Sequence, residues 1–170
     1  MLKAQFDMMA NYNAFANHRL FEAAATLSEV DYRADQGAFF KSVEGTLNHL
    51  LVADRIWMKR FTGAGAAPDR LDAILFRDFA ALRAAREAED SRIRVYVDAL
   101  TGDEILRKIT YRSITSAKLI EQPMWQALAH FFNHQTHHRG QVHALLTRIT
   151  GAAPELDLLI YQRLAKAGAA

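Results

Sequence analysis

The sequence predicts an all-α protein built as a four-helix bundle. Two observations carry this prediction. Apolar residues recur at spacings of three, four and seven in four long segments, as expected for amphipathic helices. The connections between these segments are short, and short connections place helices side by side around a shared core.

The first long helix is expected near the N-terminus. From about residue 4 to residue 27, apolar side chains return at helical spacing among polar neighbours. Residues 28–41 are polar and show no period, which predicts a loop packed by Phe39 and Phe40.

The second and third long helices are bounded by residues that start and stop helices. Ser42 is a typical N-cap residue, and the apolar stripe behind it ends before Gly63. A further apolar pattern begins near Phe79 and stops near Thr101. We therefore expect one helix from residue 42 to the glycine and another from residue 79 to about residue 100.

The last third of the chain contains the most regular pattern. Residues 108–122 are β-branched and loosely alternating, which predicts a short hairpin. Pro123 suits the first turn of a helix, and residues 124–150 form the fourth long helix, ended by Gly151. Residues 155–166 are expected to add a short C-terminal helix.

Composition excludes several classes of protein. The 170 residues suit one domain spanning residues 1–170, and the formal charge of only +2 argues against a nucleic-acid partner. No apolar run approaches the roughly 20 residues that span a bilayer, and the first residues lack a signal peptide, so we expect no membrane partner and a cytoplasmic location. Cysteine is absent, so any metal site must use nitrogen and oxygen ligands.

Histidines are concentrated in the fourth long helix, at His130, His134, His137, His138 and His143. At about 100° per residue, His138 falls inside the apolar arc and His134 on its margin. His130 and His137 lie beyond that margin toward solvent, and His143 lies on the opposite border. Because residues four apart share a helix face, His134 and His138 can reach one cation.

A third protein ligand is not selected by helical geometry. His18 and His49 remain, and His49 lies roughly 80° from the apolar stripe of its own helix, although Ala53 and Ile56 extend apolar character to its side. Histidine pairs with this spacing also arise by chance, and a histidine on an amphipathic margin is more often a hydrogen-bonded surface group. Spacing alone therefore leaves both interpretations open.

Several segments of the sequence resemble the DinB-like family of four-helix-bundle metal proteins. The similar segments are Tyr12–Asn17 in the first helix, Gly45–Asp54 and Trp57 in the second, Asn133–Val142 in the fourth, and Leu156-Asp157 after it. They cover nearly the whole chain in order. The resemblance implies helices in up-down-down-up order and a metal site formed by His49, His134 and His138.

Three neutral imidazoles without thiolate suit zinc or nickel and leave positions for water or substrate. The resemblance implies a small-molecule substrate, use of a low-molecular-weight thiol, and a homodimer. The homodimer is also expected because one small bundle should leave apolar residues such as Phe21, Ile74 and Phe76 partly uncovered. With no evident general base in the sequence, a thiol-dependent transferase is favoured over a hydrolase. The alternatives are a non-catalytic metal-binding or small-ligand-binding stress protein, and an interaction module with vestigial histidines that binds no metal.

Two residues within the predicted helices are expected to have structural roles. Asp54 falls within an apolar arc and needs a cationic or hydrogen-bonding partner, for which Arg19, Arg139 or backbone amides could serve. Gly140, inside a helix, predicts a close helix crossing.

The roles of three polar residues near the histidines have two interpretations. Asn48, Gln135 and Asp157 could orient imidazoles or serve as caps and surface groups. Trp57 and Trp125 are expected in the core.

Overall fold

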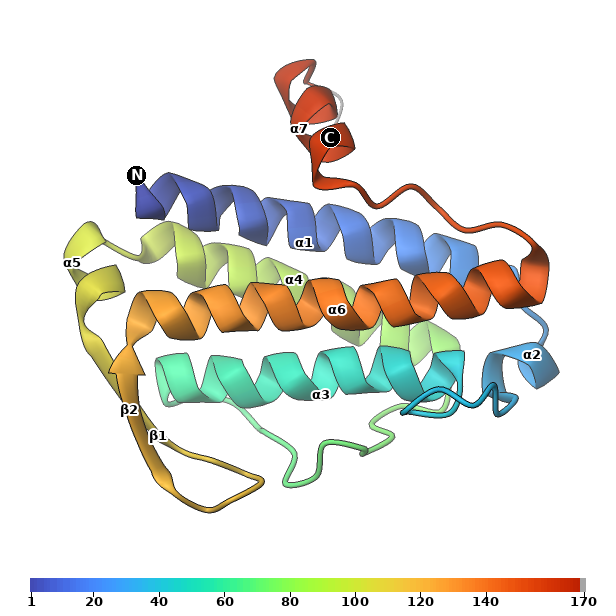
Figure 1. Ribbon diagram of the computed structural model, residues 1–170, viewed down its shortest axis with the longest axis horizontal. Helices are drawn as coiled ribbons and strands as arrows, with labels where there is room; N and C mark the ends of the chain where they lie inside the picture. The colour runs from blue at the N-terminus through green and yellow to red at the C-terminus, as the bar shows by residue number, and fades with distance from the viewer. Residues whose placement is uncertain (169–170) are drawn as a thin grey trace.

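Four long helices dominate the structure, a computed structural model that describes residues 1–168. They are α1 (Leu2–Ala24), α3 (Val43–Thr62), α4 (Phe79–Ala99) and α6 (Met124–Thr150). The predicted predominantly helical fold is confirmed (Figure 1). No helix among the described residues is both long enough and apolar enough to cross a membrane.

Local signals explain where these helices begin and end. Ser42 accepts a hydrogen bond of 3.0 Å from the N–H of Gly45, as predicted for the N-cap of α3. Asp78 caps α4 in the same way, with a hydrogen bond of 2.8 Å from its first turn. Helices α3 and α6 end at Gly63 and Gly151, whose φ angles of 72° and 79° are left-handed and unstrained only in glycine.

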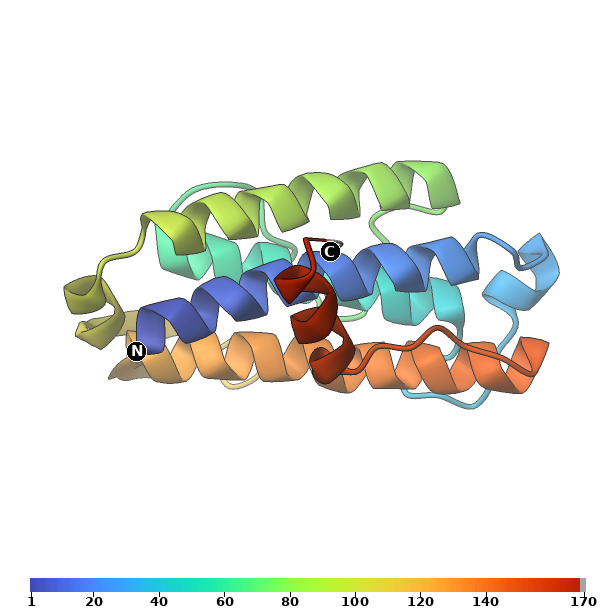
Figure 2. The same cartoon turned by 90° about the horizontal axis from the view of Figure 1, so that it is seen from above.

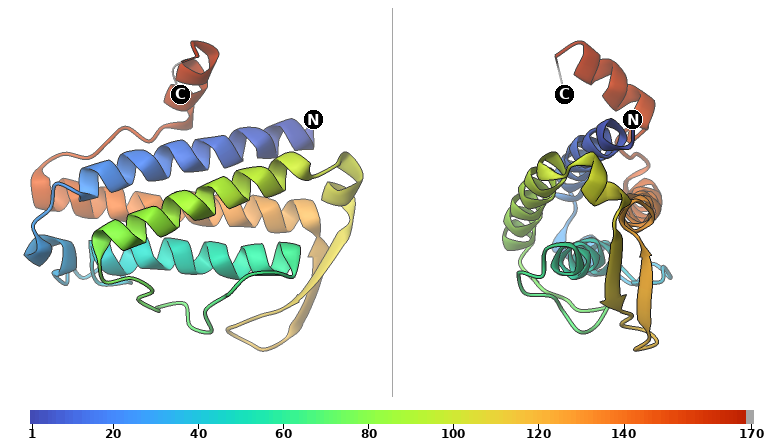
Figure 3. Two further views of the ribbon diagram at one scale, coloured as in Figure 1. Left: turned by 180° about the vertical axis from the view of Figure 1, so that it is seen from behind. Right: turned by 90° about the vertical axis from the view of Figure 1, so that its left-hand side faces the viewer.

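The four long helices lie side by side. Helix α1 packs against α4 and α6, and α3 packs against the same two helices. The end-on view in Figure 3 shows this arrangement. Helices α1 and α6 run in one direction along the long axis, whereas α3 and α4 run in the opposite direction (Figures 1 and 2).

Two apolar clusters fill the interior and a polar layer separates them. One cluster includes Phe6, Trp57, Ile93, Phe131 and Phe132. The other includes Leu20, Leu47, Leu82, Val142 and Leu146. Each long helix contributes buried polar side chains to this layer: Asn13 and Asn17 in α1, Asp54 in α3, Arg86 and Asp90 in α4, and Gln135 and Arg139 in α6.

Asp54 finds its cationic partner in Arg86. The carboxylate and guanidinium are 2.6 Å apart and both side chains are inaccessible to solvent or nearly so. The predicted need for a partner is confirmed, but Arg19 and Arg139 are not that partner, because their guanidinium groups hydrogen-bond elsewhere. In the sequence Arg86 only interrupts an apolar stripe. Its burial is tolerated because Asp90 also pairs with it, at 3.0 Å.

The predicted hairpin is confirmed. Strand β1 (Lys108–Arg112) pairs antiparallel with β2 (Leu119–Pro123) immediately before α6. The C-terminal helix, α7 (Leu158–Lys166), starts three residues later than predicted. It lies beyond α1 and away from α3 and α4 (Figures 1 and 3), and it packs on α1 through Tyr161, whose ring centroid is 5.4 Å from that of Phe15.

Two short helices were not predicted. Helix α2 (Glu29–Arg33) lies inside the segment expected to be a loop, and α5 (Gly102–Leu106) follows α4. Each has five residues, too few to show a helical period in the sequence. In the sequence, only their N-cap residues, Ser28 and Thr101, indicated where these helices begin. Thr101 forms a complete capping box with Glu104.

Three local predictions are wrong. A Cβ added at Gly140 would meet nothing within 4 Å, because this position faces solvent rather than a crossing helix. Trp125 is 38% exposed, since it lies in the first turn of α6 on the flank away from the core, whereas Trp57 is buried as expected. Phe39 is 84% exposed, and only Phe40 of that pair turns toward the long helices.

Candidate metal centre

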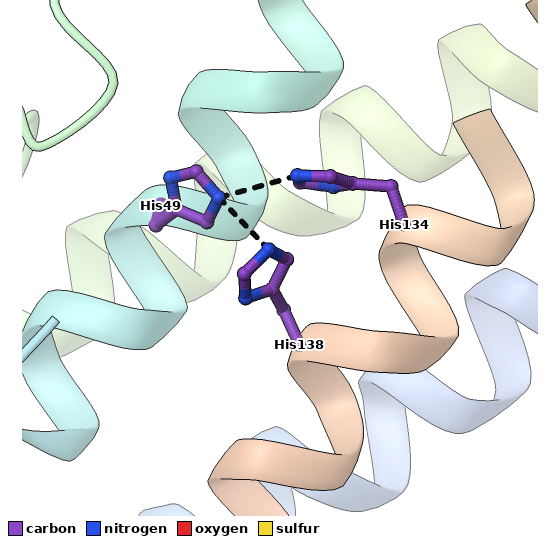
Figure 4. A group of neighbouring side chains, drawn as sticks. All are labelled: His49, His134 and His138. Carbon is purple, nitrogen blue, oxygen red and sulfur yellow. Dashed lines mark hydrogen bonds between the residues drawn. The ribbon is translucent and has the colours of Figure 1, made fainter. Parts of the chain in front are cut away.

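Three histidine side chains converge between α3 and α6. His49 Nε2 lies 3.4 Å from His134 Nε2 and 3.3 Å from His138 Nε2 (Figure 4). One nitrogen from each ring lies within 4.8 Å of the other two. His134 and His138 are one turn apart on α6, and the packing of α6 against α3 brings His49 to face them.

The other histidines lie outside this group. His137 is exposed and its Nε2 lies 3.3 Å from the side-chain nitrogen of Gln141. His49 and His138, by contrast, are 3% and 8% exposed. His18 is exposed on α1, on the opposite side of the long helices from α3. His130 contacts Trp57 instead, with the ring centroids 5.2 Å apart and the rings tilted by 54°.

Two oxygen atoms orient the imidazoles. His49 Nδ1 lies 2.7 Å from the backbone carbonyl of Leu71, and His138 Nδ1 lies 2.8 Å from the side-chain oxygen of Gln141. Each oxygen accepts a hydrogen bond, so each Nδ1 carries the proton. The spacing of Gln141, three residues after His138, could have revealed this contact. Leu71 acts through its backbone, which leaves no signal in the sequence.

Asn48, Gln135 and Asp157, the polar residues considered as partners of the histidines, contact other groups. Asn48 accepts hydrogen bonds from the backbone N–H groups of Leu75, at 2.8 Å, and Phe76, at 3.0 Å, and thereby fixes the segment between α3 and α4. Gln135 donates to the carbonyl of Leu50 and to a buried carboxylate. Asp157 is the N-cap residue of α7. None of these side chains hydrogen-bonds an imidazole. Of the two interpretations left open by the sequence, the cap holds for Asp157, whereas Asn48 and Gln135 are buried and join neighbouring segments.

The donor set fits a divalent metal ion. Because His49 and His138 both hold their proton on Nδ1, both Nε2 atoms present lone pairs, which face each other at 3.3 Å with no hydrogen between them. A cation between them turns this repulsion into attraction. Zinc–nitrogen bonds of about 2.0–2.1 Å in tetrahedral geometry separate the nitrogens by about 3.3–3.4 Å, which agrees with the separations of 3.3 and 3.4 Å.

The surroundings keep the three imidazoles neutral. Burial lowers the pKa of His49 from 6.5 to about 4 and that of His134 to about 3, and it also lowers the pKa of His138. Neighbouring imidazoles add to the decrease for His134, since a second positive charge would be repelled. Neutral imidazole is the form that binds a metal ion. At neutral pH the lone pairs are therefore available.

Phe40 covers one face of the group. Its ring stacks on His49 with the centroids 3.7 Å apart and an interplanar angle of 17°. The segment before α3 can reach this position only because residue 45 is glycine, since a Cβ there would overlap the carbonyl oxygen of Phe40. Glycine at position 45 therefore allows Phe40 to shield His49. The position of Gly45 in the sequence did not reveal this role.

The group contains three histidines and no carboxylate among residues 1–168. Three histidine ligands would leave coordination positions open on a bound ion, which is the pattern of catalytic rather than closed structural sites.

Comparison with known proteins agrees with this arrangement. A sequence profile of the DinB family matches residues 1–169. The chain is 25% identical over 158 residues to Protein DinB of Bacillus subtilis (strain 168), an alignment that covers 91% of this chain and 92% of that protein. No solved structure matches the chain. Since the profile spans almost the whole sequence, the chain belongs to the DinB family.

Proposed function

We propose that the protein binds one divalent transition metal ion, zinc or nickel, through His49, His134 and His138, and that it is a thiol-dependent transferase. One observation supports this most: the Nε2 lone pairs of His49 and His138 face each other at 3.3 Å, an arrangement that a cation stabilises. Membership of the DinB family agrees with a metal site at these positions.

When bound, the ion would supply Lewis-acid chemistry, lowering the pKa of a thiol or of water at an open position near neutral pH. Hydrolysis by zinc enzymes commonly also needs a glutamate or aspartate as general base. The three-histidine group has no such carboxylate, and the nearby buried Asp54 is engaged by Arg86. An external thiol, which brings its own nucleophile, suits this site better.

The protein's own residues prepare the site. The Leu71 carbonyl and the Gln141 side chain fix the ring orientations of His49 and His138. Phe40 shields the outer face of His49 from water. These contacts hold the Nε2 atoms of His49 and His138 in place before a ligand arrives, which reduces the entropic cost of assembling the site.

We further infer that residues 1–170 form one domain, an up-down-down-up four-helix bundle, and that two copies form a homodimer in the cytoplasm. The antiparallel relation of α1 and α6 to α3 and α4 supports this helix order (Figure 1). Of the apolar residues expected to be exposed, Phe21 is buried at 2% exposure, so it offers no surface to a partner. Ile74 is 37% exposed and could contact a second copy.

The proposal is tested by metal content and turnover together. Purified protein, loaded with zinc and separately with nickel, is incubated with cysteine or glutathione and a fluorogenic electrophile. We expect thioether product to form faster than in solution, and to fall to the background rate after chelation or in His134→Ala. Stoichiometric metal without any rate enhancement supports the alternative, a binding protein without turnover. Absence of metal binding contradicts the proposal.

A further inference from the structure

A pocket of about 430 Å³ opens beside His134, within the size range of small-ligand sites. Its walls come from α3, from the hairpin and its turn, from α6, and from Leu71 in the segment between α3 and α4. Leu71 is also the residue whose carbonyl orients His49. The pocket and the three-histidine group therefore share residues, and a ligand in the pocket reaches one edge of that group.

Arg60 is the charged residue in this pocket. Its guanidinium lies over the Trp57 ring at 4.4 Å and over the Tyr111 ring at 4.5 Å, so two aromatic faces fix its position. The guanidinium donates a long hydrogen bond, 3.4 Å, to the backbone carbonyl of Arg112. Most of its hydrogen-bonding capacity is left for another acceptor.

Arg60 lacks a counter-charge within residues 1–168. None of the ion pairs there includes it. Three other partly buried arginines, Arg55, Arg83 and Arg92, each pair with a glutamate. Within the same residues Arg19 is also without an ion pair, but it donates a hydrogen bond of 2.9 Å to the carbonyl of Glu155. A partly desolvated cation without a partner is costly, and an anionic ligand removes that cost.

The remaining walls are mainly apolar. Ala53 and Ile56 of α3 face the pocket, together with Ile114 and Ile120 of the hairpin. Such walls favour a ligand with an apolar or aromatic body, while the hydroxyl groups of the turn line the rim. The pocket therefore combines one fixed cation with an apolar chamber.

We propose that this pocket binds the second substrate, a small organic carboxylate with an apolar body, whose carboxylate pairs with Arg60. The body then lies along Ile56 and Ile120, and the far end of the ligand approaches His134. This inference rests on the proposed function, because it treats the three-histidine group as the place where the other reactant is activated. Arg60 thereby determines which substrates the site accepts.

The test uses benzoate and its uncharged isostere benzamide as probes, titrated into metal-free protein at constant ionic strength. Binding is followed by the indole N–H resonance of Trp57, with that of Trp125 as an internal reference because Trp125 lies outside the pocket. We expect benzoate to shift the first resonance and leave the second unchanged. Benzamide should bind about tenfold more weakly.

Variants then assign the effect to Arg60. Arg60→Met keeps the aliphatic stem and should weaken benzoate binding about tenfold, measured by calorimetry. Arg60→Lys retains the charge and should recover part of the loss. Arg163→Met, at an exposed arginine of α7, is the matched control and should bind benzoate normally. Equal binding of benzoate and benzamide, or unchanged binding by Arg60→Met, overturns the inference.

Two further measurements separate this inference from the proposed function. Zinc should bind Arg60→Met as tightly as it binds the wild type, because Arg60 is not one of the three ligands. In cobalt-loaded protein the protons of bound benzoate should relax faster than in zinc-loaded protein. Arg60-dependent benzoate binding without any metal binding contradicts the proposed function alone. Normal metal binding without accelerated relaxation overturns the placement of the ligand beside His134.

Discussion

Gln135 donates a side-chain hydrogen bond of 3.2 Å to the backbone carbonyl of Leu50. These two residues directly follow His134 and His49 in the sequence, so the bond ties α6 to α3 at the level of the histidines. The same amide donates to Asp54, whose carboxylate pairs with Arg86. The polar layer therefore joins the two helices that carry the proposed ligands.

Replacing Gln135 should destabilise the protein. Gln135→Leu removes a donor from the fully buried Asp54 and should lower the free energy of unfolding by about 1–3 kcal/mol. Urea denaturation measures this change. Gln126→Leu, at an exposed position of the same helix, is the control and should change stability by less than about 0.5 kcal/mol. An equal effect of the two substitutions would show that the buried amide contributes nothing particular.

The Asp54 carboxyl should give stability a definite pH dependence. Burial raises its pKa from 3.8 to about 7, against the opposing attraction of Arg86. Between these values the folded protein holds a proton that the unfolded chain has released. This group's contribution to the unfolding free energy therefore falls as pH rises from about 4 to about 7.

Asp54→Asn removes this titration. The wild type should lose stability relative to the variant as pH rises through that interval, measured by urea denaturation at several pH values. Asp98→Asn, at an exposed position of α4, should parallel the wild type. A difference between wild type and Asp54→Asn that does not change with pH is incompatible with a raised pKa.

Much of the fold could be predicted because its signals are local. Caps such as Ser42 and stops such as Gly151 act within a few residues, and the long helices repeat their pattern many times. The polar layer could not be predicted in the same way, since the pairing of Asp54 with Arg86 depends on which helices meet. For the site, spacing indicated His134 and His138, but His49 came from family resemblance.

The contacts of Leu71 and Phe40 with His49 could not be predicted from the sequence, for physical reasons. The backbone carbonyl of Leu71 carries no residue-type signal, because any residue there offers the same oxygen. Phe40 was expected to pack within a loop, yet its contact with His49 depends on the chain path that Gly45 allows. His49 is therefore positioned by a backbone atom and by a contact distant in the sequence, and neither produces a pattern of residue types.

The fold should persist without metal. The two apolar clusters lie on either side of the polar layer and neither includes the three histidines, so the core does not depend on an ion. Far-ultraviolet circular dichroism with and without a chelator should give nearly the same helical signal. Loss of most of that signal on chelation would show instead that the ion is required for folding.

We predict a homodimer in solution. Exposed apolar side chains such as Ile74, Val95 and Leu159, at 37%, 71% and 53% exposure, offer surface that a second copy could cover. Multi-angle light scattering at micromolar concentration measures the mass directly. A value of one chain, near 19.2 kDa, contradicts this prediction.

The most direct test of the metal site compares two adjacent histidines. His138 faces His49 while His137 is exposed, and they are about 100° apart on the helix, so one variant removes a proposed ligand and the other is its matched control. Wild type, His138→Ala and His137→Ala are titrated with zinc by calorimetry at neutral pH. His138→Ala should lose more affinity than the roughly 10- to 100-fold typical of losing an outer partner, while His137→Ala should bind almost normally. Equal affinities in the two variants, or a greater loss in His137→Ala, would contradict the three-histidine site.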